Sequence, residues 1–361
     1  MGDTFSGQGK YAKAGVDTEA ISSGLNNLLS WVSKTHNLRS EMGEYVAGAN
    51  FFASVVKISN QFSLAISTDG VGSKSMVAQI AGKYESIGYD CVAVNVNDVI
   101  CVGAEPVALV DYISVEAPKS DLLSEIGKGL YEGSIAAGIS IVGGELSVHP
   151  DSLQGPNPGY AFDISGTAVG ILENRVPILG QDLVPGDVII GIPSNGIHAN
   201  GLTLARDILL KDYESSSPNV YGSLIQELLK PTRIYVPEVM ALLNNEIEVH
   251  GLAHISGDGL LNLSRLNADV DYIIDSLIPT PLIFDQIKNQ GKIGVDEMFQ
   301  VFNMGVGFCV IVASAHASEA LAILNKTSEG VQRIGTVVRG NRQIEIKAHS
   351  LVSRNGQFTY Q

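Results

Sequence analysis

The sequence predicts a mixed α/β or α+β protein built from two domains. Short apolar runs typical of buried strands alternate with longer, helix-like runs in both halves of the chain. The pattern restarts near residue 172, where the polar stretch "ENRVPILGQDLVPGD", punctuated by Pro and Gly, begins. The length of 361 residues agrees, because a domain usually has about 150 residues.

The first domain is predicted to span residues 1–172. Its expected strands are "FSLAIST", "VALVDYIS", "ISIVGG" and "FDISGTAVGIL". The run "GYDCVAVNVNDVICVGA" fits a strand or a helix by apolar content, but its length and the Gly103 stop favour a helix. The run "SDLLSEIGKGLYEGSIAAG" predicts another helix, with Ser120 as its N-cap and Gly138 just past its end.

The second domain is predicted to span residues 173–345, followed by a tail, 346–361. Strands are expected at "VIIGIPS", "VGFCVIVAS" and finally "VQRIGTVV". Helices are expected at "GLTLARDILL", "PTRIYVPEVMALLNN", "TPLIFDQIKNQ" and "ASEALAILNK". A glycine-containing turn is expected at "HISGDG".

Composition excludes several classes of partner and location. The net charge of −15 argues against nucleic acid and anionic membranes, and it means that a phosphate ligand would need local cations. No apolar run reaches the length of a membrane span, and the N-terminus lacks the layout of a secretory signal. Cys91, Cys101 and Cys309 form no C-x-x-C pair and lie in apolar surroundings, so we expect reduced thiols and a cytoplasmic protein.

The stretch "LAISTDGVGSK" places charged residues and glycines at the end of an apolar strand. Asp69, Gly70, Gly72 and Lys74 follow the strand at once. An Asp-Gly pair alone is most simply a turn. The sharper interpretation is a phosphate and metal site, because glycines admit backbone N–H groups to phosphate, a carboxylate holds Mg²⁺ and a lysine adds positive charge. The stretch is not a Walker A loop.

Two further acidic positions fit the same interpretation. Asn95 and Asp98 lie three apart on the predicted helix, near its C-terminal end, where the dipole disfavours a carboxylate unless a cation is near. In "IVGGELSVHP", a strand is expected to end at Gly143 and Gly144, followed by Glu145. Either motif alone fits a solvated acid or a turn. Together with Asp69 they indicate carboxylates that converge on Mg²⁺ beside ATP.

The stretch "SNGIHANGLTLAR" gathers polar residues before a helix. The free N–H groups of that helix would favour an anion, and His198 and Asn200 would add hydrogen-bond donors. The simpler alternative is an N-cap at Asn200 with His198 exposed. Other chemistries have little support, since G-x-S-x-G, H-E-x-x-H and zinc-type Cys/His sets are absent.

The order of these motifs resembles the phosphoribosylformylglycinamidine cyclo-ligase family, also called aminoimidazole ribonucleotide synthetases. The matching stretches are "YAKAGVD", "STDGVGSK", "IGYDCVAVNVNDVICVGAEP", "IVGGE", "SNGIHANG", "PTRIYV", "GLAHISGDG" and "FNMGVG", from about Lys10 to Val338. The D-x4-G-A-x-P pattern, Asp98 to Pro106, is shared by a wider superfamily that includes thiamine-monophosphate kinase and a hydrogenase maturation protein. The motifs "AGVD", "PTRIYV" and "FN-x-G-x-G" are more particular to the cyclo-ligases.

The resemblance implies a reaction and an assembly. The family uses ATP to phosphorylate the amide oxygen of formylglycinamidine ribonucleotide, after which an amidine nitrogen closes the imidazole ring of aminoimidazole ribonucleotide in purine biosynthesis. Mg²⁺ is required. The family's N-terminal α/β domain pairs into a β-barrel-like homodimer, an α+β domain follows, and the active site lies in the cleft between the two domains.

The resemblance also implies site residues. The metal ligands would be Asp69, Asp98 and Glu145, and the catalytic residues Asp69, Lys74, Asp98 and His198. The nucleotide would contact Lys13, Gly70, Gly72, Lys74, Gly143 and Gly144. The substrate would contact His198, Asn200, Gly201, Gly257 and Gly259.

The sequence departs from the family pattern at two of these motifs. Leu146 replaces the usual Thr after "GGE", and Asp258 adds a negative charge within the glycine turn. Two alternatives therefore stand beside an active cyclo-ligase. One is a superfamily relative that phosphorylates a different small molecule, and the other is a non-catalytic paralogue that binds ATP.

Overall fold

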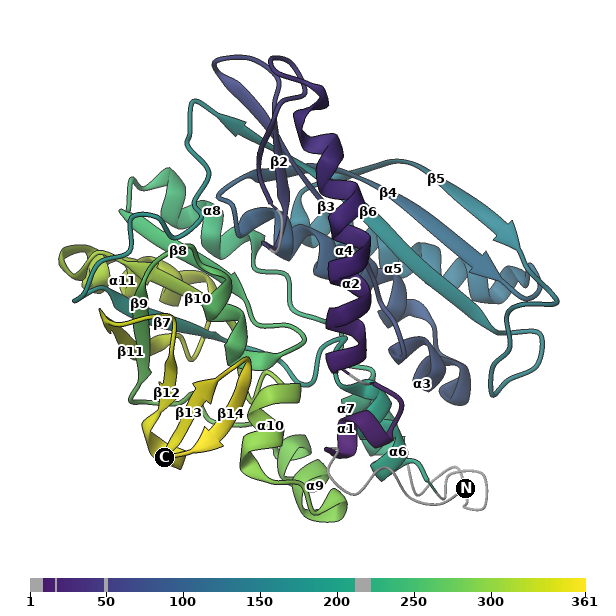
Figure 1. The fold of residues 1–361 in the computed structure, drawn as a ribbon. Coiled ribbons are helices and arrows are strands. Elements are labelled where there is room, and N and C mark those ends of the chain that lie inside the picture. Colours follow the sequence, from purple (N-terminus) through teal and green to yellow (C-terminus); the bar gives the residue numbers. More distant parts are fainter. Residues whose placement is uncertain (1–8, 17, 49–50, 212–221) are drawn as a thin grey trace.

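The structure, a computed structural model, describes residues 9–16, 18–48, 51–211 and 222–361. It contains two β-sheets with helices packed around them, and Figure 1 shows the first at the upper right and the second at the lower left. The mixed architecture predicted from the sequence is thereby confirmed. None of the helices in these ranges is long and apolar enough to cross a membrane.

The first sheet has the strand order β1-β2-β3-β6-β4-β5. Strands β4 and β5 are parallel and are joined by helix α5, whereas the other neighbours are antiparallel. In chain order the elements of this half are α1 (Lys10–Lys13), α2 (Thr18–Val32), η1 (Ser33–Leu38), β1 (Tyr45–Ala47), β2 (Ser54–Lys57), β3 (Phe62–Gly70), α3 (Lys74–Ala81), α4 (Glu85–Ile100), β4 (Glu105–Val115), α5 (Ser120–Ala137), β5 (Ser140–Val148) and β6 (Phe162–Glu173).

One face of this sheet is covered and the other is open. Helix α4 packs against β3, β4 and β6, and α5 packs against α4. Along β6, buried residues therefore alternate with partly exposed ones, the pattern of a sheet covered on one side. The uncovered side, called the open face below, carries the apolar residues Leu64, Ile66, Val110, Tyr112 and Val169.

The second sheet has the order β14-β13-β12-β9-β11-β7-β10-β8, in which only β9 and β12 are parallel neighbours. Its strands are rich in Val and Ile, and β10 is buried along its whole length. In chain order the elements of this half are β7 (Val188–Pro193), α6 (Leu202–Leu209), α7 (Gly222–Leu228), α8 (Val236–Asn244), β8 (Val249–His254), η3 (Gly259–Arg265), β9 (Val270–Ile274), α9 (Leu282–Gly291), α10 (Val295–Val301), β10 (Val306–Val312), η4 (Ser314–His316), α11 (Ala317–Thr327), β11 (Gln332–Arg339), β12 (Ile344–Ile346), η5 (Lys347–His349), β13 (Leu351–Arg354) and β14 (Gln357–Tyr360).

Several local expectations are wrong. Residues 346–361 are not a tail, because β13 and β14 form an antiparallel hairpin at the edge of the second sheet. The helix expected from Pro231 begins only at Val236, since side chains of the first domain hold the backbone before it. Helix α5 starts at Ser120 itself, so Ser120 is its first residue and not its N-cap.

Candidate active site between the two domains

Asp69 and Asp98 come together where the first domain meets the second. Asp69 lies near the end of β3, and Asn95 on α4 fixes its backbone through two hydrogen bonds, from Asp69 N (2.8 Å) and to Asp69 O (3.1 Å). Asp98 lies one turn further along α4. The expectation that Asn95 and Asp98 share one face of a helix is confirmed, and that face brings Asp98 toward Asp69.

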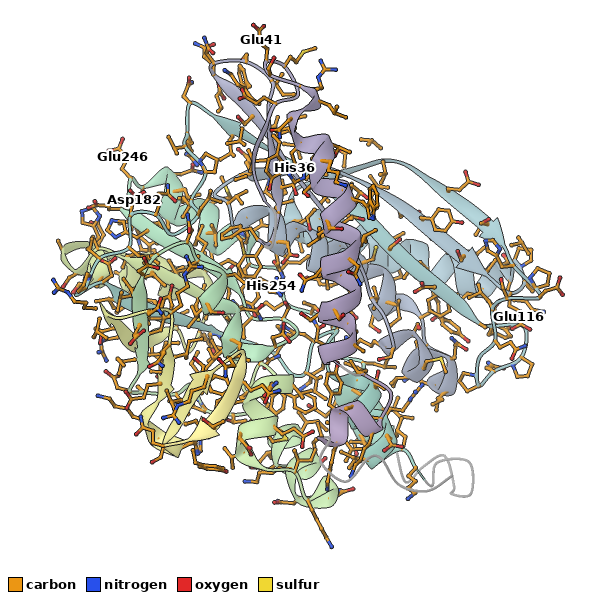
Figure 2. All side chains as sticks on the ribbon, in the orientation of Figure 1. His36, Glu41, Glu116, Asp182, Glu246 and His254 are labelled. Carbon is orange, nitrogen blue, oxygen red and sulfur yellow. The ribbon has the colours of Figure 1, made fainter. Side chains whose placement is uncertain are left out.

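A histidine of the second domain completes this contact. His254, the last residue of β8, has its Nδ1 atom 2.9 Å from Asp98 Oδ1. Its side chain is buried, and Figure 2 labels it between the two domains, beside α2 in this view. The Asp98 carboxylate is therefore oriented by a residue from the other domain, which ties the geometry of this site to the packing of the domains.

The protonation of Asp69 reflects its crowded surroundings. Burial raises the pKa of Asp69 to about 6, and the nearby Asp98 carboxylate adds to the rise. The N–H of Gly70, His254 and Arg265 act in the opposite direction. A hard cation would relieve the repulsion that the Asp98 carboxylate exerts on a charged Asp69.

Lys74 points into the interface between the two domains. Its side chain is fully buried, with Nζ 2.6 Å from Asp90 Oδ2 and 2.6 Å from the carbonyl oxygen of Lys230. Burial lowers the pKa of Lys74, and the Asp90 carboxylate opposes that effect. In this geometry the ammonium group is already paired between the two domains, and the expectation that Lys74 neutralises phosphate stays a prediction.

The Lys74–Asp90 pair belongs to a buried polar junction that holds the backbone of the segment 230–235. Asp90 Oδ1 accepts a hydrogen bond from Thr232 N at 2.5 Å. Asn97 donates to the carbonyl oxygen of Arg233 (2.8 Å) and accepts from Tyr235 N (2.9 Å). The motif "PTRIYV" thus contributes extended backbone that side chains of α3 and α4 capture, which is why it is not helical.

Glu145 lies apart from the two aspartates within one chain. Asp69, Gly166, Asp111 and Gly144 lie in one row across the sheet, so Glu145 points to the opposite side, the open face. Three strand spacings, about 14 Å, separate the strands of Asp69 and Gly144. In the described part of the chain, no group of three or more His, Cys, Asp or Glu residues is placed to hold a metal ion.

Gly143 and Gly144 lie inside strand β5 and not in a turn. The strand continues to Val148 along the edge of the sheet, so the expected strand end at "GG" is wrong. A Cβ atom on Gly144 would lie 2.5 Å from Oδ1 of Asp111 on the neighbouring strand. Gly144 therefore makes room for a side chain of the sheet, which is a structural reason for this glycine.

Of the two polar side chains expected to contact substrate from the loop before α6, His198 is buried and Asn200 is partly accessible. His198 is buried, with its Nε2 atom 3.5 Å from Arg233 N, and burial holds the pKa of its imidazole well below the usual range. In this geometry the His198 imidazole makes an internal contact, and its expected contact with substrate stays a prediction. Asn200 remains half-buried and adjoins Gly257, since a Cβ atom on Gly257 would lie 3.2 Å from Asn200 Oδ1.

The other two glycines of the predicted substrate group have packing roles. A Cβ atom on Gly201 would lie 2.4 Å from the ring of Phe302, and one on Gly259 would lie 2.3 Å from the carbonyl oxygen of Phe299. Both glycines also have positive φ values, +78° and +55°. Close packing and backbone conformation account for them without a ligand.

The glycine turn after Asp69 is different. Gly72 has a φ of +67°, and a Cβ atom built on it would meet nothing within 4 Å. The turn joins β3 to the start of α3, where Ser73 Oγ accepts a hydrogen bond from Thr203 Oγ1 at the start of α6 (2.8 Å). Two helix N-termini therefore meet across the domain interface, next to open space. Lys13 is exposed on α1, which contacts α6.

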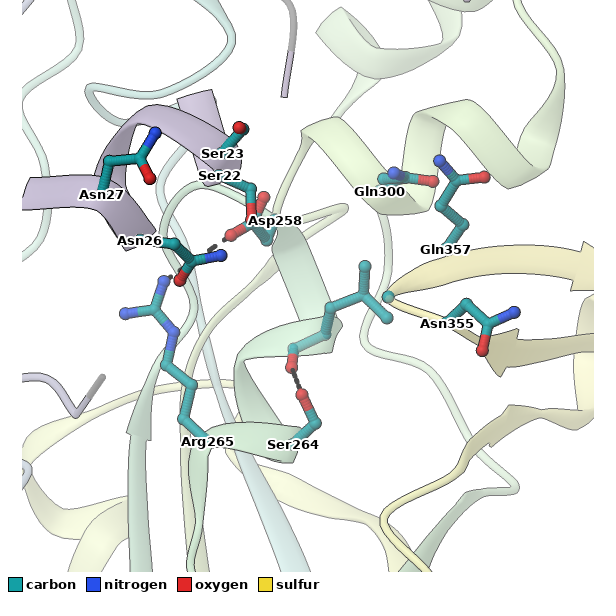
Figure 3. A pocket seen from close by; sticks show the side chains of 12 residues that line it. Ser22, Ser23, Asn26, Asn27, Asp258, Ser264, Arg265, Gln300, Asn355 and Gln357 are labelled. Carbon is teal, nitrogen blue, oxygen red and sulfur yellow. Dashed lines mark hydrogen bonds and ion pairs between the residues drawn. The ribbon is translucent and has the colours of Figure 1, made fainter. Parts of the chain in front are cut away.

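A polar pocket of about 690 Å³ lies where α2, the stretch 258–265 and the C-terminal hairpin meet (Figure 3). Asp258 and Arg265 lie on one wall, with Asp258 Oδ2 3.6 Å from Arg265 Nη2. Asn26 of α2 points toward this pair, and Asn355 and Gln357 of the C-terminal hairpin line another wall. The additional charge of Asp258, the departure noted in the sequence, is thus opposed by a neighbouring guanidinium.

Sequence reasoning missed His254, Arg265 and Asp90. His254 and Arg265 belong to the second domain, and their proximity to Asp69 arises only from the packing of the domains. A signal for Asp90 was present, since a charged residue within the apolar run "GYDCVAV" requires a buried partner. That partner is Lys74.

Comparison with protein families gives matches to both domains. Residues 52–172 match the family "AIR synthase related protein, N-terminal domain", and residues 184–347 match "AIR synthase related protein, C-terminal domain". Among solved structures, the thiamine monophosphate kinase of Aquifex aeolicus has a TM-score of 0.59 at 19% identity, covering 89% of this chain and 97% of that one. A hydrogenase maturation protein HypE in complex with ATP has a TM-score of 0.56 at 19% identity, covering 79% and 82%. These structures show a shared fold.

Curated relatives are much closer in sequence. The phosphoribosylformylglycinamidine cyclo-ligase of Pyrococcus horikoshii is 45% identical over 349 residues, covering 94% of this chain and 98% of the relative. The protein of the same name from Thermococcus kodakarensis is 46% identical over 91% of this chain and 95% of its own. The one from Methanothermobacter thermautotrophicus is 40% identical over 94% and 97%. The chain therefore belongs to the phosphoribosylformylglycinamidine cyclo-ligase family.

Proposed function

We propose that this protein is an ATP-dependent cyclo-ligase that converts formylglycinamidine ribonucleotide to aminoimidazole ribonucleotide. ATP transfers its γ-phosphoryl group to the amide oxygen, and an amidine nitrogen then attacks that carbon. The C–O bond breaks as the imidazole ring closes, which releases phosphate alongside ADP. The observation that carries the proposal is the 45% identity with the Pyrococcus horikoshii cyclo-ligase over 94% of this chain.

Asp69 and Asp98 fit a Mg²⁺ site. Burial, and then the proximity of Asp98, raise the pKa of Asp69, and the oxygen-only donor set suits a hard cation. When bound, Mg²⁺ would neutralise charge on the phosphoryl oxygens of ATP. His254 acts as a positioning residue, because its contact with Asp98 fixes the direction of that carboxylate.

The nucleotide would lie along the turn that follows Asp69. Gly72 leaves open space there, which allows backbone N–H groups to approach phosphate. Arg265 takes the role of the nearby cation that the sequence had suggested for Lys74. Lys13, exposed on α1, would contact the nucleotide from the N-terminal arm. Catalysis by this chain then consists of orientation and electrostatic stabilisation, with no covalent protein intermediate.

The substrate would occupy the region around Asn200 and Gly257. These residues adjoin each other, and the nearby start of α6 offers free backbone N–H groups to the substrate phosphate. His198 supports this region from within, through its contact with Arg233 N.

We also propose a homodimer formed through the open face of the first sheet. On that face Val110 and Tyr112 are exposed, and the other apolar side chains are only half-buried. Glu145 points to the same side, so it would lie in the dimer interface, and any role as a metal ligand would require a contact across that interface. Light scattering at micromolar concentration should give twice the 38.2 kDa mass of the chain, and a single-chain mass would contradict the dimer.

The cytoplasmic location that the cysteines led us to expect also stays a prediction. All three are buried and free, which fits a cytoplasmic protein but does not require one.

The activity is tested by ADP release from purified protein. We expect release that depends on both Mg²⁺ and formylglycinamidine ribonucleotide. Asp98→Asn preserves the shape of the side chain but removes its charge, and ATP affinity should fall at least about tenfold, ~1.4 kcal/mol. ADP release with thiamine monophosphate in place of the ribonucleotide would indicate the relative with a different substrate. ATP binding without any turnover would indicate the non-catalytic paralogue.

A further inference from the structure

Helix α2 has its apolar side turned outward. Its Ile21, Leu25, Leu28 and Val32 recur at intervals of three or four residues and so form one stripe along the helix. Their side chains are 57%, 47%, 59% and 44% exposed. A helix on the surface of a single globular chain normally directs such a stripe toward the core, so the stripe of α2 lacks its usual cover.

The polar side of α2 lies nearer the rest of the chain, although its side chains are exposed as well. Ser22, Ser23, Asn26 and Asn27 line the pocket that also contains Asp258 and Arg265 (Figure 3). These contacts are sparse. Within the described residues, η1 is the only element with which α2 makes extensive contact, and η1 simply continues the chain.

Such a helix needs a further partner to be stable. Fifteen residues are close to the lower limit for an isolated helix in water, and most helices in proteins depend on burial of their apolar side. Gly24 within α2 weakens the helix further, by about 0.5–1 kcal/mol relative to Ala. A partner that packs against the stripe would therefore supply the stabilisation that α2 lacks within its own chain.

The chemistry of the stripe argues against a membrane as the partner. Helices that lie on membranes usually carry Lys and Arg on their polar side, and α2 has neither. The net charge of −15 would also repel anionic lipid. An uncharged, apolar protein surface fits better.

The chain offers such a surface close in sequence to α2. The exposed apolar residues continue beyond the helix through Leu38, Met42 and Val46, and Val46 lies on the edge strand β1 of the first sheet. That sheet presents the open face. A second copy of the chain would bring its own α2 stripe and its own open face, so that apolar surfaces of the two copies bury each other.

We propose that the stripe of α2 packs against a second copy of this chain, as an extension of the dimer interface; this inference rests on the dimer proposed above. The partner copy then holds α2 in place, and α2 in turn holds Asn26 against the Asp258–Arg265 wall of the pocket. The pocket is complete only in the dimer, and a monomer has one loose wall.

Hydrogen exchange of the wild-type protein is the first test. The amides of residues 18–32 should be protected at concentrations well above the dimer dissociation constant and should lose at least tenfold in protection well below it. Equal protection in dimer and monomer would overturn the inference, because α2 would then be stable without a partner.

Substitutions provide the second test. Leu25→Ser/Leu28→Ser should raise the dimer dissociation constant at least tenfold and remove the protection of α2. The matched control is Ile135→Ser on α5, a site as exposed as Leu28 (59%) but on the covered side of the sheet, and it should change neither. Tyr112→Glu on the open face should give monomers.

These variants separate failure of the inference from failure of the dimer. If Tyr112→Glu is monomeric while the α2 double variant remains dimeric with α2 protected, the dimer stands and the role of α2 is refuted. If the wild-type protein stays monomeric even at about 100 μM, the dimer itself is refuted, and the role of α2 falls with it.

Discussion

Replacing Lys74 tests whether this residue serves the fold or the nucleotide. In Lys74→Met the side chain keeps its length but loses its charge, which leaves Asp90 buried without its cation and the Lys230 carbonyl without its donor. Removing one partner of a buried ion pair costs about 3–5 kcal/mol. For a protein of this size, the melting temperature should fall by at least about 6 °C.

A double-mutant cycle makes the test specific. In Lys74→Met/Asp90→Asn, no uncompensated charge remains, and the amide oxygen of the new Asn can still accept the hydrogen bond from Thr232 N. We expect the double variant to recover much of the loss, with a coupling energy of about 2 kcal/mol or more. Thermal and denaturant unfolding measure stability, and calorimetry on the folded variants measures ATP affinity.

The reasoning would be refuted by the opposite result. If Lys74→Met keeps its melting temperature within about 2 °C and loses tenfold or more in ATP affinity, Lys74 is a phosphate ligand and its burial is not the functional state. Arg265→Met is the comparison variant, since it should weaken ATP binding with little effect on stability.

The remaining predictions concern pH, two glycines and Asn200. Because the pKa of Asp69 is raised in the folded state, the contribution of Asp69 to stability falls as pH rises from about 4 to 6. Asp69→Asn should therefore stabilise the metal-free protein at pH 7 by about 1–2 kcal/mol, a figure that is reduced because the Asp69 side chain is partly exposed to solvent. Denaturant unfolding at pH 3.5 should show no difference between the variant and the wild type. Mg²⁺ competes with a proton at this carboxyl, so calorimetry should show metal-dependent ATP binding that weakens below pH 6. Gly259→Ala should lower stability by about 1–3 kcal/mol, because its Cβ atom would approach the Phe299 carbonyl at positive φ, whereas Gly72→Ala should fold and lose ATP affinity. Asn200→Ala should raise the KM for the ribonucleotide about tenfold and leave ATP affinity unchanged, and steady-state kinetics would contradict this if both parameters moved together.

The sequence predicted elements whose pattern is local. The helix that carries Asn95 and Asp98 is present as expected, and β3 leads into the turn after Asp69. The C-terminal hairpin was missed although Asn355-Gly356, a strong hairpin signal, was present; both residues have the positive φ values that its turn requires.

The role of Lys74 could not be predicted in the same way. A lysine after a glycine turn looks the same in sequence whether it points to phosphate or to a buried carboxylate. Its partner, Asp90, is sixteen residues away, and the carbonyl it contacts belongs to the other domain. Likewise, no periodicity indicates that Glu145 and Asp69 point to opposite sides of one sheet, because this depends on strand order and register.

The hairpin at the end of the chain has a consequence for synthesis on the ribosome. Strand β9 lies between β11 and β12, and the hairpin of β13 and β14 extends the sheet from β12, so the second sheet cannot be completed until residues 351–360 have been translated. Asn355 and Gln357, which line the pocket, are among them. The first domain can fold as it emerges, whereas the second sheet must wait until the hairpin of β13 and β14 has left the ribosome. Ribosomes stalled before Leu351 has been translated should therefore carry a folded first domain, and the pocket should lack its wall from the hairpin.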